Sequence, residues 1–357
     1  MHRRWIIGTG FAIILHWLTL FVFAAELVPQ TTKRPDAFYF HHGGDNYAYF
    51  NQAMAMQSGT VIESKYPLGF SMLIVPVLPF TDPDTHDYVA QIIAFLWSVV
   101  LYPVGLIILA RITYLLTRCN DMTLIATIFY AAMPLLTFLS LNLIWNAEMA
   151  EINTTHMMWA QMLSDGPTAF FTMLAAWLML VARQHDYKLR YVFLVGIVAG
   201  ILVLLRFSAV LVVAVIGLLF LFERKFVAGI LLGIVALAVY SPQMIYNQHF
   251  FGDILTTGYT ALDELPVYGL FDSRYLSEAL TKFSERLGIF SILIGFFATA
   301  SLLWVLRWLW QKSPAGVWLI GGWLLSYIAF YSVYYYSWTG AFLRFMIPAL
   351  PAIAIIG

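Results

Sequence analysis

Two charged residues near the N-terminus have side chains suited to a group transfer. Asp45 follows two glycines and precedes an aromatic segment, and Lys65 stands directly before a tyrosine and a proline. A carboxylate can take a proton from an attacking hydroxyl group as a general base, or it can hold a divalent cation. A lysine ammonium is a compact charge that suits a phosphate. The two residues therefore predict a site where a nucleophile is activated and an anion departs.

Each of these residues also has a purely structural interpretation. Asp45 begins a stretch, up to Ser58, that is expected to form a helix ended by Gly59, so its carboxylate could cap that helix. A capping acid stays ionised at a helix start, so the structural and the chemical roles are compatible. Lys65 could simply lay its stem on the membrane and keep its charge in water.

Three further charged residues stand at the ends of apolar segments. Asp165 lies in a Ser-Asp-Gly-Pro sequence, whose residue types are also common at helix starts. Arg206 separates two apolar runs and must reach the surface or an anion, because its charge costs roughly 2.5–3.5 kcal/mol inside a bilayer. Arg344 begins the last apolar run. Together with Lys65, the two arginines would stabilise the developing charge of a phosphate or pyrophosphate leaving group.

The composition places these residues in a membrane protein. Of the 357 residues, 61% are hydrophobic and only 11% are charged, whereas a soluble domain carries about 25% charged residues. The net charge of zero argues against a nucleic-acid partner, which would need a basic surface. The single cysteine, Cys119, excludes an intrachain disulfide and a cysteine-rich metal centre.

About ten apolar runs are candidates for crossing a bilayer, which takes about 20 residues. They are expected at 5–27, 88–110, 121–143, 165–182, 190–205, 207–222, 226–246, 287–306, 315–336 and 344–357. The first run is too long for a signal peptide, so it is predicted to be a retained helix. Because the tenth run stops at Gly357, we expect the sequence to be a fragment of a longer protein.

The basic residues predict how the chain is oriented. With the N-terminus in the cytoplasm, most lysines and arginines between the runs fall in short inner loops, as the positive-inside rule requires. The outer loops, expected at 28–87, 144–164, 247–286 and 337–343, are longer and more acidic. The first of them carries the expected helix and a proline-broken apolar stretch over 67–80, both suited to the membrane surface. The sequence thus predicts one all-α transmembrane domain, 1–357, with its chemistry on the outer face.

Other functions remain open at this point. Outer-loop histidines, among them His41, His42 and His156, could bind a divalent metal together with carboxylates, but no pair has the spacing of a dedicated site. A transporter would carry ionisable residues near the middle of its helices, and His16 is the only one well inside a predicted span. A membrane scaffold would not need arginines at the ends of apolar runs beside a long acidic loop.

Several short motifs, in order along nearly the whole chain, resemble the GT-C superfamily of integral-membrane glycosyltransferases. The nearest branch is the one around protein O-mannosyltransferases and the lipid A aminoarabinose transferase. The motifs are Asp45 with the aromatic helix after it, Lys65-Tyr66-Pro67-Leu68-Gly69, Ser164-Asp165-Gly166-Pro167, Leu205-Arg206-Phe207, Tyr246-Asn247 with Phe251-Gly252-Asp253, and Arg344-Phe345 with Pro348-Ala349-Leu350-Pro351.

This resemblance implies an inverting transfer of a sugar from a polyprenyl-phosphate donor to a lipid, glycan or protein acceptor, outside a bacterial inner membrane. Asp45 would then be the base or the acid that orients the acceptor, and Asp165 would be a second acid of the site. Lys65, Arg206 and Arg344 would contact the donor phosphate. A polymerase or ligase of lipid-linked oligosaccharides could use the same loops, so that alternative stands beside the transferase.

Overall fold

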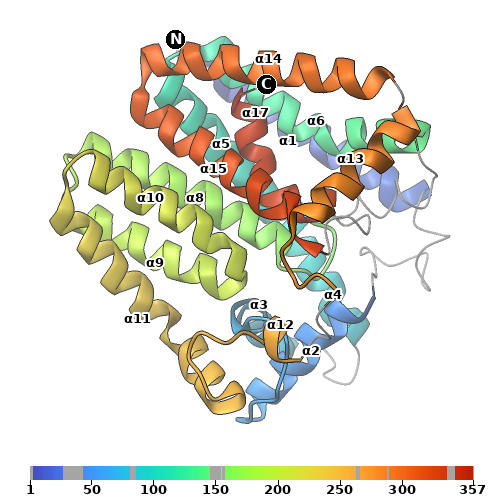
Figure 1. Ribbon diagram of the computed structural model, residues 1–357, viewed down its shortest axis with the longest axis vertical. Coiled ribbons are helices and arrows are strands. Elements are labelled where there is room, and N and C mark those ends of the chain that lie inside the picture. The colour runs from blue at the N-terminus through green and yellow to red at the C-terminus, as the bar shows by residue number, and fades with distance from the viewer. Residues whose placement is uncertain are drawn as a thin grey trace.

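The computed structural model describes residues 3–26, 43–80, 86–144, 154, 157–262, 266–287, 289–335 and 342–356. Helices account for most of these residues, and an isolated β-bridge joins Phe271 to Tyr334. The all-α class expected from the sequence is confirmed for this part of the chain. The helices, shown in Figure 1, are α1 (Arg3–Glu26), α2 (Gly43–Gln57), α3 (Leu68–Ile74), η2 (Val75–Phe80), α4 (His86–Phe95), η3 (Leu96–Leu101), α5 (Tyr102–Thr117), α6 (Asn120–Ile144), α8 (Asp165–Gln184), α9 (Leu189–Leu205), η4 (Phe207–Ala209), α10 (Val210–Phe222), α11 (Phe226–Phe251), α12 (Gly258–Ala261), α13 (Ser273–Leu287), α14 (Ile289–Lys312), α15 (Pro314–Ser332), α16 (Phe342–Met346), η6 (Ile347–Ala349) and α17 (Leu350–Ile356).

Where the structure describes them, the predicted apolar runs fall almost entirely on helices, which is the architecture of an integral membrane protein. Among the described residues, six helices are long and apolar enough to cross a membrane. The fifth, sixth and tenth runs form shorter apolar helices, as does the stretch Leu68–Phe80 of the first outer loop. Helices α9 and α10 are therefore two short segments that meet at Arg206, as the sequence suggested.

Helix α9 packs between α8 and α11, and Figure 1 shows these three helices lying side by side. Two glycines on α9 permit the close approach of α11. A Cβ atom at Gly196 would lie 2.7 Å from Cβ of Val235, and one at Gly200 would lie 2.5 Å from Cβ of Val239. Small residues four positions apart are a common way for helices to pack in membranes, where backbones must approach closely to gain contact. This packing fixes the helix whose end carries Arg206.

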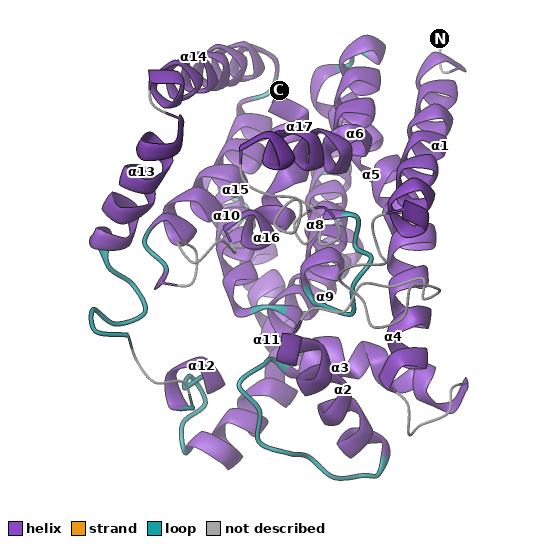
Figure 2. Ribbon diagram, turned by 90° about the vertical axis from the view of Figure 1, so that its right-hand side faces the viewer, coloured by secondary structure: helices purple, strands orange, loops and turns teal. Residues whose placement is uncertain are grey.

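The described residues 43–80 form a helical layer at one end of the bundle. Helix α2 matches the helix predicted to start at Asp45 but begins two residues earlier, and Gly59 follows it with φ +75°. Helix α3 packs against α2 and against α9. A Cβ at Gly69 would lie 2.5 Å from the backbone of Leu204, so α3 lies directly on the end of α9. Figure 2 shows α2, α3 and α12 grouped at this end.

A π-helical turn, η3, interrupts the long helix that starts at His86 and ends at Thr117. Helix α1 is attached to this turn by two side chains: Nε2 of His16 donates to the Ser98 carbonyl at 2.8 Å, and Nε1 of Trp17 donates to the Val99 carbonyl at 3.3 Å. π-turns leave backbone groups that need such partners. His16, the one ionisable residue well inside a predicted span, therefore has a structural role, which further disfavours ion-coupled transport.

The tight contact between α9 and α11 gives a first prediction. In Gly200→Ala, the added methyl group would lie 2.5 Å from Val239 and 2.7 Å from the Ala236 carbonyl, so we expect a loss of about 1–3 kcal/mol from overpacking. Gly217→Ala in α10 is the control, because no heavy atom lies within 4 Å of that Cβ position. Alanine there should raise the melting temperature slightly. Thermal unfolding in detergent that shifted the same way in both variants would contradict this packing.

Candidate active site

Four of the five charged residues selected from the sequence meet in one cluster. They are Asp45 in the first turn of α2, Asp165 at the start of α8, Arg206 directly after α9, and Arg344 in α16. The guanidinium group of Arg344 bridges the two acids: Nη2 donates to Asp45 Oδ2 at 2.8 Å, and Nε donates to Asp165 Oδ2 at 3.0 Å. Arg206 donates from Nη1 to the other oxygen of Asp165. Two acids and two arginines thus form one continuous network.

Solvent reaches the members of this network to different degrees. The Asp165 side chain is 2% exposed, and each arginine side chain is 14% exposed. The Asp45 side chain is 30% exposed. Buried charges persist only when they are paired, so removing one member leaves another uncompensated. Asp165 is therefore the inner anchor of both arginines, and Asp45 is the acid that a substrate can reach.

The charges around Asp45 keep it ionised. Burial alone would raise the pKa of this carboxyl, but the charge of Arg344 and the hydrogen bonds from Tyr66 and Arg344 outweigh burial and the nearby charge of Asp165. The pKa of Asp45 consequently lies below its ordinary value. Asp45 is thus a carboxylate at neutral pH and can accept a hydrogen bond from a hydroxyl group. It becomes a stronger base if an anion offsets the charge of Arg344.

Two tyrosines complete the immediate surroundings of Asp45. The Tyr66 hydroxyl donates to Asp45 Oδ1 at 2.5 Å, and burial together with the charge of Asp45 raises the pKa of Tyr66 above its ordinary value. The ring of Tyr49 lies 4.9 Å from that of Tyr66, and its hydroxyl donates to Ser164 Oγ at 3.1 Å. Tyr49 thereby connects α2 to the residue before Asp165. Tyr66 belongs to one of the short sequence motifs, but the sequence alone predicted no role for either tyrosine.

Lys65, the fifth selected residue, is connected to this network through its neighbour. Its Nζ atom lies 5.4 Å from the centroid of the Tyr66 ring, and the residue is half-buried. The loop that carries it is closely packed, because a Cβ at Gly258 in α12 would lie 2.2 Å from Cα of Lys65. The Tyr246 hydroxyl holds the same loop by accepting from the Ser64 amide at 2.6 Å. Lys65 is therefore fixed at the edge of the network.

Aromatic rings support the two arginines from the side of α15 and α16. The guanidinium carbon of Arg206 lies 5.0 Å from the centroid of the Phe345 ring, and that of Arg344 lies 5.9 Å from it. Tyr331 stacks on Phe345 at 5.2 Å and donates from its hydroxyl to Ser208 Oγ at 2.7 Å. A cation near an aromatic face gains roughly 0.5–2 kcal/mol. The rings therefore orient both guanidinium groups.

The described residues contain no group of three histidines, cysteines or acids that could hold a metal ion. Asp45 and Asp165 are joined instead by Arg344, a cation that already occupies one oxygen of each carboxylate. Of the histidines considered as metal ligands, His41, His42 and His156 lie outside the described residues, and His249 lies in the last turn of α11. The guanidinium group of Arg344 thus stands between the two carboxylates, where a metal ion shared by both would otherwise lie.

The arrangement of these helices is the fold of the GT-C integral-membrane glycosyltransferases, as the resemblance in the sequence implied. It is similar to the oligosaccharyltransferase of Archaeoglobus fulgidus in complex with zinc and sulfate, with a TM-score of 0.58 and 11% identity over 98% of this chain and 48% of that one. ArnT from Cupriavidus metallidurans, bound to undecaprenyl phosphate, matches with a TM-score of 0.56 and 14% identity over 98% and 59% of the two chains.

A further structure of the Archaeoglobus fulgidus enzyme, AglB with an inhibitory peptide and a dolichol-phosphate, has a TM-score of 0.54 and 12% identity over 99% of this chain and 50% of that one. The chain spans about half to three fifths of the length of these structures. No protein-family model and no curated protein matches the sequence. At these identities the similarity establishes the fold, and the function has to be argued from the site.

The position of Asp165 between two arginines predicts a large effect on stability. Asp165→Asn removes the carboxylate charge with which both guanidinium groups pair. Breaking a buried ion pair costs about 3–5 kcal/mol. Asp186→Asn is the matched control, because Asp186 is 86% exposed in its ion pair with Lys225 and surface pairs contribute little. We expect thermal unfolding to show a strongly lowered midpoint only for Asp165→Asn, and similar midpoints for the two variants would contradict the network.

The hydrogen bond from Tyr66 predicts a change in the titration of Asp45. That bond lowers the pKa of Asp45, so Tyr66→Phe should raise it toward the ordinary value. The stability gained from ionised Asp45 is present above the ordinary pKa and is lost as the pH falls through the lowered one, so in the variant the acid-induced loss should be smaller and complete at a higher pH. Infrared titration of the carboxylate band measures the shift. Tyr49→Phe is the control, because its hydroxyl bonds Ser164 and not Asp45.

Proposed function

We propose that this protein is an inverting glycosyltransferase that moves a sugar from a polyprenyl-phosphate donor to an acceptor hydroxyl or amide. The observation that carries the proposal is the bridge from Arg344 to the reachable acid Asp45 and the buried acid Asp165. It places a group that can take a proton beside cations that can hold a phosphate. An inverting transfer needs both a group for the proton of the acceptor and cations for the departing phosphate.

In the proposed reaction, the acceptor atom attacks the anomeric carbon of the donor. The bond from that carbon to the phosphate oxygen breaks, and its electron pair leaves with the phosphate. Asp45 accepts the proton of the acceptor as the new bond forms. Electrostatic stabilisation of the departing anion is the larger contribution in such transfers, and base catalysis adds about 10²–10⁴ in rate.

The arginines fit the phosphate for two reasons. A guanidinium group carries five N–H donors, and the bonds from Arg206 and Arg344 to the two acids use only some of them. Phosphate binding would also offset the charge that lowers the pKa of Asp45, so Asp45 would become more basic when the donor is in place. Lys65, at the edge of the network, is proposed to contact the same phosphate from the loop.

The donor class is supported by what the similar structures contain. ArnT from Cupriavidus metallidurans was crystallised with undecaprenyl phosphate, and AglB from Archaeoglobus fulgidus was determined with a dolichol-phosphate. Both compounds are polyprenyl phosphates, and both proteins share this fold at low sequence identity. The acceptor is proposed to be a lipid, a glycan or a protein. A site at the ends of apolar helices suits a donor whose tail stays in the membrane.

The basic residues in short loops support the proposed placement in the cell. With the N-terminus in the cytoplasm, the network lies at the outer ends of α8 and α9, because both helices connect on the other side through the turn at 185–188, which Arg183 and Arg190 flank. The positive-inside rule favours this orientation. We accordingly place the protein in a bacterial inner membrane with its site on the outer face.

The decisive test is sugar transfer by the purified protein from synthetic polyprenyl-phosphate sugars, compared with Asp45→Asn. We expect the turnover rate of the variant to fall by a factor of about 10²–10⁴. The variant should still bind the donor, because the arginines remain. Glu63→Gln is the matched control, since Glu63 is an exposed acid of the same outer loop and its loss should leave turnover unchanged. Equal turnover in wild type and Asp45→Asn would remove Asp45 from the chemical step.

A second measurement concerns the phosphate. Arg206→Lys keeps the positive charge beside Asp165 but replaces a planar fork with a single ammonium group. We expect the KM for the donor to rise about tenfold, with a smaller change in kcat, because a hydrogen bond to a charged group contributes roughly 1.5–3 kcal/mol. Arg183→Lys, in the turn at the other end of α8, should leave KM unchanged. A changed kcat at constant KM would argue against a contact to the bound donor.

A further inference from the structure

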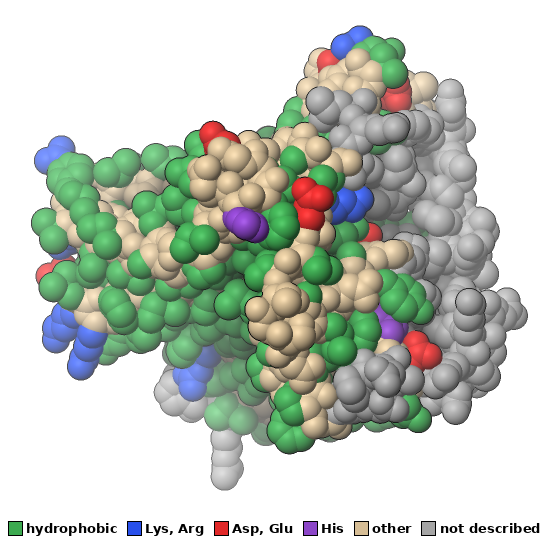
Figure 3. Space-filling view, turned by 90° about the horizontal axis from the view of Figure 1, so that it is seen from below, with side chains coloured by type: hydrophobic (Ala, Val, Ile, Leu, Met, Phe, Trp, Pro, Cys, Tyr) green, Lys and Arg blue, Asp and Glu red, His purple; other side chains and the backbone are tan. Residues whose placement is uncertain are grey.

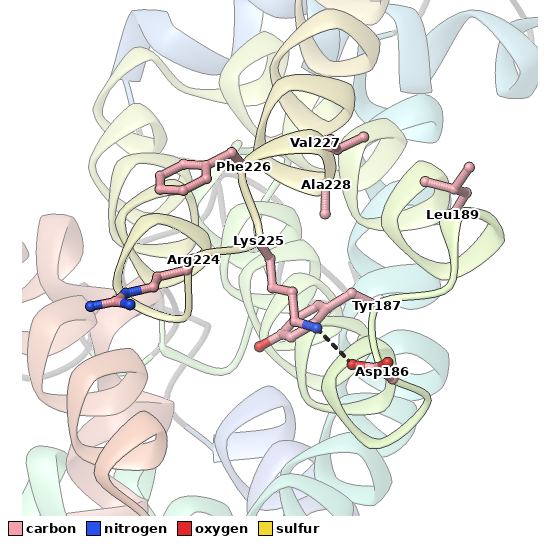
Figure 4. A pocket seen from close by; sticks show the side chains of 8 residues that line it. All are labelled: Asp186, Tyr187, Leu189, Arg224, Lys225, Phe226, Val227 and Ala228. Carbon is pink, nitrogen blue, oxygen red and sulfur yellow. Dashed lines mark hydrogen bonds and ion pairs between the residues drawn. The ribbon is translucent and has the colours of Figure 1, made fainter.

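A cavity lies at the ends of α8 and α9 that are far from the candidate active site. Helix α8 runs from Asp165 in the network to Gln184 beside this cavity, and its 20 residues correspond to about 30 Å. The cavity has a volume of about 300 Å³. It lies between the α8–α9 turn and the α10–α11 turn and is lined by Asp186, Tyr187, Leu189, Arg224, Lys225, Phe226, Val227 and Ala228, as Figure 4 shows.

The two turns carry more positive than negative charge. Both of their acids already have basic partners: Lys225 Nζ lies 2.8 Å from Asp186 Oδ1, and Arg183 Nε lies 2.7 Å from Glu223 Oε1. The exposed basic residues outside these pairs are Lys188, Arg190 and Arg224. Figure 3 shows basic side chains gathered at the left edge of the molecule, where Figure 1 places these turns. The surface around the cavity is therefore suited to an anion.

Tyr187 forms the connection between the two turns. Its side chain is buried, its hydroxyl donates to Glu223, and Lys225 Nζ lies 5.7 Å from the centroid of its ring. Figure 4 shows Lys225 reaching over Tyr187 toward Asp186. Three of the five non-glycine residues with positive φ in the described chain line this cavity, namely Asp186, Tyr187 and Arg224. Such conformations persist only where surrounding contacts hold them, so the shape of the cavity is fixed.

Apolar side chains flank the same cavity and point to a lipid. Leu189 is 60% exposed, Phe226 is 55% exposed and Val227 is 74% exposed. These residues begin two apolar helices, α9 and α11. A water-soluble phosphate compound would gain nothing from them, whereas the acyl chains of a phospholipid would cover them.

We propose that this cavity binds the headgroup of an anionic phospholipid, with Arg224 and Lys225 at the phosphate and Phe226 and Val227 against the acyl chains. The ion pair between Lys225 and Asp186 can give way to the phosphate, because Asp186 is 86% exposed and such surface pairs are weak. The site is separate from the sugar-transfer site and needs neither donor nor acceptor. It would attach the inner ends of α9 and α11 to a specific lipid.

The test is lipid retention by the purified full chain in phosphatidylcholine micelles that contain a minor fraction of phosphatidylglycerol. Native mass spectrometry counts the phosphatidylglycerol that stays bound. In Arg224→Asn/Lys225→Gln we expect retention to fall about 25-fold, since each of the two basic residues near an anionic lipid contributes roughly fivefold. Asparagine is chosen at position 224 because it tolerates positive φ. Thermal unfolding confirms that the variant is folded.

The matched control removes two exposed charges from another turn. Arg307→Gln/Lys312→Gln acts at the end of α14 and should retain phosphatidylglycerol as the wild type does. Equal retention in all three proteins, or an equal loss in both variants, would overturn the proposal, because lipid binding would then depend only on the general positive charge of the surface and not on the cavity.

Val227→Asn should also weaken the retention of phosphatidylglycerol severalfold. Displacement of the lipid by inorganic phosphate as readily as by short-chain phosphatidylglycerol would show that the apolar residues are not used, and would overturn the assignment to a phospholipid.

Discussion

One guanidinium group, that of Arg344, determines the charge state of the candidate site. Two carboxylates close together repel each other, and one of them would ordinarily take up a proton. Arg344 donates to both, so its positive charge offsets the repulsion between Asp45 and Asp165. The two acids still differ, because Asp165 is enclosed and held by a second arginine, whereas Asp45 keeps an exposed edge. The same interaction thus yields one acid that holds the site together and one that is free to meet a substrate.

This bridge joins parts of the chain that are far apart in sequence. Arg344 lies 299 positions from Asp45 and 179 from Asp165. The residue therefore reaches its partners only after α16 has packed into the helices formed earlier along the chain. The close contacts of α9 with α11 and of α3 with α9 place the remaining members. Membrane helices gain little from hydrophobic burial against one another, so shape and polar pairing have to supply this precision.

The sequence predicted which charged residues are notable better than it predicted the contacts between them. Asp165, Arg206 and Arg344 stood out because charges at the ends of apolar runs are costly unless they are paired. The end of α2 was predictable because Gly59 supplies the left-handed conformation that follows it. The bridge by Arg344, the hydrogen bond from Tyr66 and the ring of Phe345 were not predictable, because they depend on how distant helices pack. For the same reason Lys65, chosen for its charge alone, lies at the edge of the network rather than within it.

The π-turn η3 has a geometric consequence for the long helix that contains it. One extra residue in a helical turn rotates everything beyond it by about 100°, since an α-helix has 3.6 residues per turn. The segment before the turn, α4, contacts α2 and η2, and the ring of His86 stacks on Tyr47 at 4.0 Å. The segment after it, α5, contacts α6 and α8. A single helix thereby presents one face to the layer of α2 and η2 and another to the bundle. Helix α1, through His16, binds it where the two faces change over.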